Sequence, residues 1–195
     1  MLGEQMVIGK IQRLDISKVW KLETDFTKWL EDNIDILNEL VDVTLSAAER
    51  EKSAGVFSVD LVAEDNDGNL VVIENQMGKS DHDHLGKLIT YLTAIDAKAA
   101  IWIVADPRPE HITAINWLNE SRLASFYLLK LEAIQIGESQ PAPLLTLIVG
   151  PSTEGLEVGD KKKQLAERHI LRRKFWSMLL ERAKTKTKLH ATISA

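Results

Sequence analysis

Two apolar segments joined by a tight turn constrain this chain more than any other feature. Residues 56–64 and 70–76 are rich in valine, leucine and isoleucine, and Asp65-Asn66-Asp67-Gly68 lies between them. Glycine adopts positive φ angles without steric cost, so Gly68 suits the left-handed position of a three-residue hairpin loop. The sequence therefore predicts an antiparallel hairpin in which Asp65 pairs with Asn69.

The register of this hairpin brings two acidic residues together. Counting back from the loop pairs Asp60 with Glu74, and Ser58 with Gln76. Directly opposed residues point to the same face of a sheet, with Cβ atoms about 4.5–5.5 Å apart. A slip of one residue would send the two acids to opposite faces. The expected result is one patch with two carboxylates and a carboxamide.

Apolar neighbours on both strands make such a carboxylate pair costly. Two like charges ~4 Å apart repel by about 4 kcal/mol at an effective dielectric near 20. A shared proton, a basic side chain or a bound cation offsets the repulsion, and oxygen ligands suit Mg²⁺ or Mn²⁺. Alternatively, Asp60 and Glu74 belong to an edge strand or an ordinary ion-pair network. A glutamate inside Val-Val-Ile-Glu-Asn-Gln is unusual for a buried strand, which favours a functional site.

Helical and strand-like patterns alternate through the first three quarters of the chain. Apolar residues recur at helical spacing over about 22–40, in one helix or two, and over about 80–95 and 110–123. Ser80 is expected to cap the second of these segments, with Asp83 at the reciprocal position. Further strands are expected at 41–47, 99–105, 126–136 and 144–149. This order predicts an α/β fold with a mixed central sheet between helices.

Composition bounds the class of protein. The 195 residues suffice for one compact domain, expected over 1–150, followed by a linker over 151–159 and a basic helix with a polar tail over 160–195. The absence of cysteine excludes disulfides and cysteine-based zinc sites. No apolar run is long enough to span a bilayer, and residues 1–10 lack a secretory signal. We therefore expect a cytoplasmic protein without a membrane partner.

The charge of the chain is unevenly placed. The formal net charge is −5, with acids crowded before residue 45 and bases crowded after residue 160. A protein that is acidic as a whole can still present one basic face to phosphates. The basic C-terminal helix is expected to contact phosphate, or to dock on the domain or on a second subunit as a homodimer contact.

Several motifs together resemble the PD-(D/E)xK nuclease-like superfamily. They include residues 57–63 and 71–76 around the Asp-Gly turn, the run Asp81-His82-Asp83-His84-Leu85-Gly86, and the strand Ile101-Trp102-Ile103. More narrowly, they look like an uncharacterised prokaryotic family with Glu-Asn-Gln where Glu-x-Lys is usual. The resemblance covers about residues 10–149 and implies a restriction-endonuclease-like α/β/α sandwich with a C-terminal helix.

The resemblance also implies roles for the site residues. Asp60 and Glu74 match the metal-binding, catalytic carboxylates, and the Asn75 carbonyl is a further ligand by analogy. Glu23 looks like the acid that the first helix often adds to the Mg²⁺ or Mn²⁺ site. Gln76 stands where a lysine is usual, and we expect it to position the attacking water without adding charge.

Glu23 has two interpretations. It shares an apolar helix face with Phe26 and Leu30, which predicts that it points inward, with Asp25 as the second candidate. Otherwise Glu23 is an exposed acid in the first helical turn, where the helix dipole favours negative charge.

A basic and aromatic helix face is the expected nucleic-acid contact. His84, Lys87 and Tyr91 share one face of the expected helix, which starts near the hairpin end. This face is expected to contact phosphate, or else to be an ordinary exposed polar face. Lys79 and Lys87 are the candidates to supply the positive charge that a lysine at position 76 would have provided.

The leading interpretation is metal-dependent phosphodiester hydrolysis of DNA, in defence or repair. The alternative is an inactive nuclease-fold module that binds nucleic acid or protein partners, because Gln76 replaces the usual lysine. A third interpretation is an acid-rich subunit that only contacts other proteins.

Overall fold

The computed structural model describes residues 8–54, 57–151 and Lys174. The chain divides into two units, Met1–Pro151 and Ser152–Ala195. The expected linker, the C-terminal helix and its homodimer contact therefore lie outside the described residues, apart from Pro151 and Lys174. Among the helices that the structure describes, none is long and apolar enough to cross a membrane.

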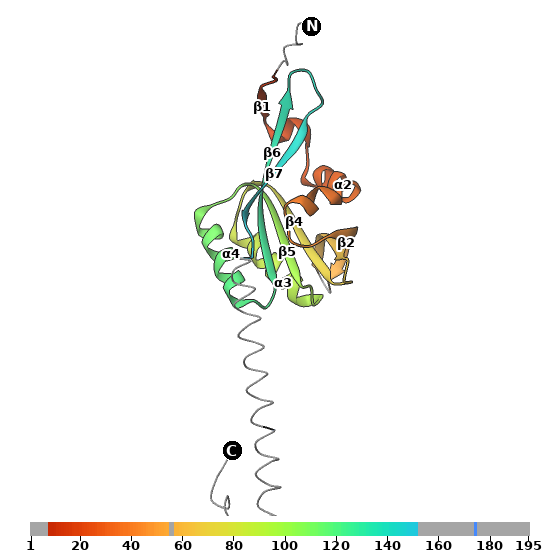
Figure 1. Cartoon of the computed structure of the whole chain (residues 1–195), viewed down its shortest axis with the longest axis vertical. Coiled ribbons are helices and arrows are strands. Elements are labelled where there is room, and N and C mark those ends of the chain that lie inside the picture. The colour runs from red at the N-terminus through yellow and green to blue at the C-terminus, as the bar shows by residue number, and fades with distance from the viewer. Residues whose placement is uncertain (1–7, 55–56, 152–173, 175–195) are drawn as a thin grey trace, which may run out of the picture. The chain divides into compact units, whose positions relative to one another are not determined.

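The fold is α/β, and its strands form one mixed sheet (Figure 1). The strand order is β1-β6-β5-β4-β3-β2, and β7 also pairs with β6. Neighbours β4, β5 and β6 are parallel, whereas the other pairs are antiparallel. The strands are β1 (Ile11–Leu14), β2 (Leu45–Ala54), β3 (Phe57–Asp65), β4 (Leu70–Lys79), β5 (Ala99–Asp106), β6 (Ser125–Ile136) and β7 (Ala142–Val149).

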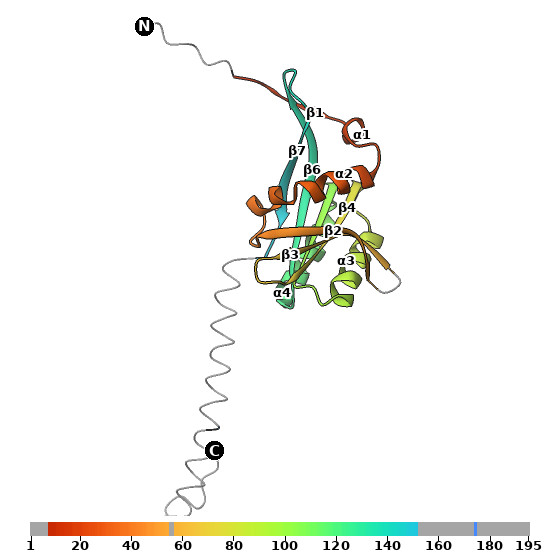
Figure 2. The same ribbon diagram turned by 90° about the vertical axis from the view of Figure 1, so that its right-hand side faces the viewer.

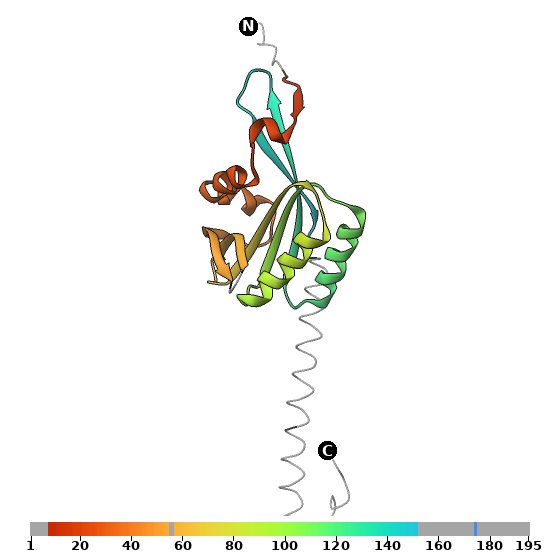
Figure 3. The same cartoon turned by 180° about the vertical axis from the view of Figure 1, so that it is seen from behind.

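Helices cover both faces of the sheet. They are α1 (Ile16–Val19), α2 (Glu23–Asp32), the 3-10 helix η1 (Ile34–Glu39), α3 (His82–Ala94) and α4 (Pro109–Ser121). The helices α3 and α4 are the crossovers between the parallel strands, as parallel pairing requires, and Figure 3 shows them in front of the sheet. Figure 2 shows α2 next to the end of β4, where the candidate site lies.

Two hydrophobic cores follow from the alternation of side chains along the strands. On one face, Phe26 and Leu30 of α2 pack in a core with Ile73 and Ile101. On the other face, Leu88 of α3 lies in a core that also contains Val72, Trp102 and Ile115 of α4. The expectation that β5 is buried on both faces is confirmed.

The predicted bounds of one strand, 41–47, are wrong. The Val41 N–H donates to the Leu37 carbonyl after η1, and β2 begins only at Leu45 and runs through polar residues to Ala54. Pairing with β3, for example of Glu49 with Val62, defines this edge strand. An edge strand can be polar, so apolar alternation does not reveal it.

The hairpin between β3 and β4 has the predicted loop, and its register is as predicted near the loop, whereas the expected pairs Asp60 with Glu74 and Ser58 with Gln76 are not regular strand pairs. Gly68 has a φ of 78°, in the left-handed region. The Asp65 N–H donates to the Asn69 carbonyl over 3.0 Å. Regular pairing runs from this loop as far as Leu61 opposite Ile73, and the candidate site lies immediately beyond that pair.

Candidate active site

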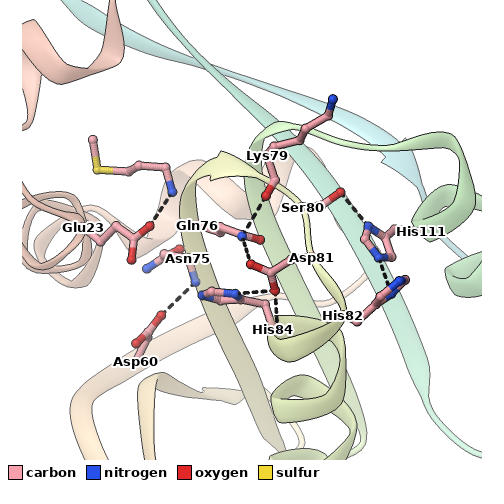
Figure 4. A network of polar contacts seen from close by, with 11 residues as sticks. Glu23, Asp60, Asn75, Gln76, Lys79, Ser80, Asp81, His82, His84 and His111 are labelled. Carbon is pink, nitrogen blue, oxygen red and sulfur yellow. Dashed lines mark hydrogen bonds and ion pairs between the residues drawn. The ribbon is translucent and has the colours of Figure 1, made fainter.

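Beyond the last regular pair of the hairpin, side chains take over the contacts between β3 and β4. The Asn75 N–H donates to Asp60 Oδ2 over 2.9 Å (Figure 4). The Asp60 N–H lies 3.5 Å from Glu74 Oε1. The second contact is at the weak limit of a hydrogen bond. The two carboxylates therefore lie together where the strands separate, and the backbone of Asn75 holds Asp60.

Burial makes this carboxylate pair electrostatically costly. Glu74 is 2% exposed and Asp60 is half-buried. Burial, reinforced by the negative charge of Asp60, raises the pKa of Glu74 to about 8. Burial also raises the pKa of Asp60, against the opposing hydrogen bond from Asn75. At neutral pH the pair therefore needs a proton or a cation.

Glu23 reaches the same end of β4 from α2. It is the first residue of that helix and is exposed, yet its Oε1 accepts a hydrogen bond from the Met77 N–H over 2.9 Å. Its charge contributes to the raised pKa values of Asp60 and Glu74. The expectation of an inward-pointing side chain is thus wrong about burial, although Glu23 does lie beside the carboxylate pair.

Asp25, the second candidate on that helix, has a local role instead. Its Oδ2 accepts from the Leu22 N–H over 3.1 Å, which satisfies a backbone donor at the start of α2. Asp25 is therefore part of the helix N-terminus and not of the carboxylate site.

The Asn75 side chain points to the opposite face of the sheet. Its Nδ2 donates to Thr27 Oγ1 over 3.0 Å, and Thr27 in turn donates to the Glu23 carbonyl. This chain of bonds ties β4 to the first turns of α2. The expected ligand at Asn75 is its carbonyl, and that role stays a prediction.

Gln76 is engaged in structural hydrogen bonds. Its Nε2 donates to the Lys79 carbonyl over 2.8 Å and to Asp81 Oδ2 over 2.6 Å (Figure 4). A carbonyl and a carboxylate only accept, so the amide nitrogen must face them, and Gln76 Oε1 is buried without a hydrogen-bond partner. This corrects the expectation that the Gln76 amide is available to position water.

Asp81 belongs to a motif of the sequence, but its role in the site was not predicted. It is the N-cap of α3, in place of the expected Ser80, and its Oδ1 accepts from the His84 N–H over 2.8 Å and from His84 Nδ1 over 2.9 Å. Partial burial alone would raise the pKa of Asp81, but these bonds and the one from Gln76 lower it to about 2. The signal in the sequence was the Asp-x-x-His spacing at the start of a helix.

The expected nucleic-acid surface is only partly exposed. Lys87 is exposed, and its charge opposes the raised pKa values of Asp60 and Glu74. Lys79 is exposed at the end of β4, with its Nζ 3.9 Å from Asp106. Tyr91 is 4% exposed because it packs in the core beneath α3, so its expected contact with nucleic acid is corrected.

A second series of polar contacts joins Ser80, His111 and His82. Ser80 Oγ lies 2.7 Å from Nδ1 of the buried His111, and His111 Nε2 lies 3.0 Å from His82 Nδ1. Ser80 Oγ also accepts from the Arg108 N–H over 2.9 Å. The sequence could not reveal this series of contacts, because Ser80 and His111 are far apart along it and meet only through packing of α4.

A cavity of about 590 Å³ adjoins the site on the side of α1 and α2. Glu23 and Met77, which are hydrogen-bonded to each other, form part of its wall. The remaining lining residues are Asp15, Ile16, Ser17, Lys21, Leu22 and Thr24. The open space thus lies beside Glu23 and Met77, and neither Asp60 nor Glu74 lines it.

The donor set fits a hard cation with few protein ligands. Within residues 8–54 and 57–151, no group of three or more His, Cys, Asp or Glu side chains is arranged to hold a metal ion. Mg²⁺, however, is usually held by one or two carboxylates and completes its shell with water and phosphate. Asp60 and Glu74, which neighbour each other where the regular strand pairing ends, supply two such carboxylates.

The chain matches no family model and no curated protein. It is similar in part to the crystal structure of a repair endonuclease from Pyrococcus abyssi, with a TM-score of 0.46 and 19% identity over 57% of this chain and 47% of that one. It is also similar to the EndoMS-dsDNA2 complex, with a TM-score of 0.43 and 20% identity over 55% of this chain and 44% of that one. The chain thus covers less than half of each solved chain, and this low-identity similarity assigns no family and no residue roles.

Proposed function

We propose that this chain is a cytoplasmic, divalent-cation-dependent hydrolase of DNA phosphodiester bonds on a restriction-endonuclease-like sandwich. The observation that carries the proposal is the pair of the buried Glu74 and the half-buried Asp60 at the open end of the hairpin. In the part of the chain that the structure describes, no ion pair joins either carboxylate to a basic side chain. A divalent cation would remove the electrostatic cost of the pair.

The carboxylates of Asp60 and Glu74 would hold Mg²⁺ or Mn²⁺, with Glu23 and the Asn75 carbonyl as further oxygen donors. When bound, such a cation lowers the pKa of a bound water and stabilises charge on the scissile phosphate. The hydrogen bond between Glu23 and the Met77 N–H keeps the start of α2 beside the pair. The Asn75 N–H holds the Asp60 carboxylate towards Glu74.

The proposal of DNA as substrate rests on the resemblance of the motifs and on the local distribution of charge. Lys87 is exposed on α3, and its charge acts on both carboxyls, whereas Lys79 is exposed at the end of β4 next to Asp106. Basic side chains near phosphates supply affinity that does not depend on base sequence. We therefore expect backbone contacts by Lys79 and Lys87, and no direct reading of bases.

A cleavage assay tests the proposed activity. Supercoiled, linear duplex and single-stranded DNA would be incubated with Mg²⁺, Mn²⁺ or EDTA, using wild type and Asp60→Ala. We expect cation-dependent cleavage that Asp60→Ala abolishes, while a thermal melt shows that the variant folds. Cleavage that persists in EDTA or in Asp60→Ala would refute the proposed site.

Cation binding gives a test that does not depend on cleavage. Because burial raises the pKa of Glu74 to about 8, a cation must displace a proton from this carboxyl. The affinity for Mn²⁺ should rise about tenfold per pH unit between about pH 6 and pH 8, with one proton released. Calorimetry in buffers of different ionisation enthalpy measures both, and Glu74→Gln should weaken binding and abolish the pH dependence.

A second candidate function is an inactive nuclease-fold module that binds nucleic acid or a protein partner. The engaged amide of Gln76 favours it, because neither a lysine nor an available amide stands at that position. Binding of Mn²⁺ and DNA without cleavage would support this function. Absence of both would favour a subunit that only contacts other proteins.

A further inference from the structure

The proposed hydrolysis requires a group that accepts a proton from the attacking water. Gln76 does not provide one, because an amide is not basic and its nitrogen is bonded to Asp81 and the Lys79 carbonyl. Asp60 and Glu74 are the proposed cation ligands. Glu23 is a further proposed ligand, and a histidine is the type of side chain whose basicity suits the remaining role.

His84 is oriented for that task by Asp81. The ionised Asp81 carboxylate only accepts hydrogen bonds, so the His84 Nδ1, at 2.9 Å from Asp81 Oδ1, must carry a hydrogen. In the neutral imidazole, the lone pair then lies on Nε2. The same carboxylate oxygen accepts from the His84 N–H over 2.8 Å, which fixes the side chain relative to its own backbone. This is the arrangement by which an acid orients a basic histidine.

The imidazole lies on the side of the carboxylate pair. Figure 4 shows His84 between Asp81 and Asp60. When it is protonated, His84 lowers the pKa of Asp60, which is consistent with their proximity. The His84 side chain is 20% exposed, so water and a substrate can reach it.

The segment that carries Asp81 is anchored on two sides. The Gln76 amide donates to its second oxygen, Oδ2, so the strand that bears Glu74 also holds Asp81. The neighbouring Ser80 donates its N–H to the Asp106 carbonyl over 3.0 Å and accepts from the Arg108 N–H. These bonds fix the start of α3 against the ends of β4 and β5.

We infer that His84 is the general base of this site, with Asp81 and Gln76 as its positioning residues; the inference rests on the proposed hydrolase function. His84 Nε2 takes one proton from water while the water oxygen bonds to phosphorus. The bond from phosphorus to the leaving ester oxygen breaks, and its electron pair stays on that oxygen, which takes a proton from a second water. His84 then returns its proton to solvent.

The assignment also accounts for glutamine at position 76. A glutamine amide donates two hydrogen bonds to this corner and leaves the charge of Asp81 intact. A lysine there would place a positive charge against Asp81 and weaken its hold on the His84 imidazolium that forms during the reaction. A neutral donor at position 76 is therefore compatible with an anionic Asp81 that orients His84.

The first test compares rate and binding in His84→Ala. We expect kcat to fall ~100-fold or more, as for loss of a general base, with KM and the DNA dissociation constant nearly unchanged. Added imidazole should restore part of the rate. A raised dissociation constant with unchanged kcat would instead make His84 a phosphate contact and overturn the inference. Unchanged kinetics in His84→Ala, with Asp60→Ala inert, would overturn it while leaving the proposed function intact.

The second test concerns the positioning role of Asp81 and does not require cleavage. Nitrogen-15 NMR of wild type should show His84 with a protonated Nδ1 and an unprotonated Nε2 when it is neutral. Asp81→Asn should alter that tautomer balance and reduce kcat, whereas the matched Asp83→Asn, an exposed acid two residues on, should change neither. A neutral His84 protonated at Nε2 in wild type would overturn the inference, as would a wild type inert on every DNA form.

Discussion

Two acidic regions lie near the end of β4, one formed by Asp60 and Glu74 and the other by Asp81, and the pKa values of their carboxyl groups shift in opposite directions. Burial raises the pKa of Glu74 to about 8 and raises that of Asp60, whereas the pKa of Asp81 falls to about 2. Burial acts in the same direction at Asp81, but His84 and Gln76 supply three hydrogen bonds to it. The supply of donors therefore decides which acid is a fixed anion and which needs a proton or a cation.

The largest expected effect comes from removing the charge at Glu74. Its folded pKa of about 8 exceeds the ordinary 4.5, so the folded protein binds more protons than the unfolded chain between these values. The free energy of unfolding should therefore fall as pH rises from about 4.5 to about 8. Glu74→Gln should not show this loss. At about pH 9, without divalent cations, its free energy of unfolding should exceed that of wild type by on the order of 3 kcal/mol.

Urea denaturation across this pH range measures the effect. Glu64→Gln, a change at an exposed residue on the same hairpin, is the control and should leave the pH profile of wild type intact. Parallel profiles for Glu74→Gln and wild type would show that Glu74 ionises normally, and the contrast with Asp81 would disappear.

The next effect concerns the amide that joins the two regions. Gln76→Glu would place a second carboxylate against Asp81 and the Lys79 carbonyl, and should lower the free energy of unfolding at neutral pH by on the order of 2 kcal/mol. Gln76→Lys keeps a donor for both acceptors, so its stability should stay within about 1 kcal/mol of wild type. Thermal and urea melts compare both variants with wild type. If Gln76→Glu were as stable as wild type, the two hydrogen bonds of Gln76 would contribute nothing to stability.

The smallest effect is expected at Asp81. Asparagine is also a good N-cap, so Asp81→Asn mainly removes the charge to which His84 and Gln76 donate. The Asp81 side chain is 43% exposed, so solvent screening limits the loss to about 1 kcal/mol at neutral pH. Because its folded pKa lies below the ordinary 3.8, this contribution is present above pH 3.8 and is lost as pH falls towards 2.

Urea melts at about pH 6 and about pH 2 check this sign. The difference between wild type and Asp81→Asn should shrink strongly at the lower pH, because Asp81 is then protonated in the unfolded state and about half protonated in the folded state. A difference that stays constant would assign it to packing and not to charge.

Features with nearby partners in the chain could be predicted from sequence. The turn around Gly68 sets the register of the hairpin, and that register brings Asp60 beside Glu74. The apolar run of β5 similarly predicted a strand buried on both faces. Local backbone preference and side-chain alternation suffice for such features because they need no knowledge of packing.

Features that depend on contacts between residues far apart in the sequence were either not predicted or predicted wrongly. The helical spacing of His84, Lys87 and Tyr91 predicted that the three side chains share one surface of the helix. Because α3 packs on the sheet, however, the Tyr91 side chain lies in the core. The polar edge strand β2 is defined by its pairing with β3 and not by its own pattern.

The sequence by itself determined the hairpin, its register and the proximity of two acids, because these follow from one turn and from period-two alternation. Only the tertiary structure decided what each acid experiences. Glu23 meets the Met77 N–H, and Gln76 meets Asp81, only after α2 and α3 have packed against the end of β4. Burial and the supply of hydrogen-bond donors are properties of the packed molecule, and they set the charge of a carboxyl group.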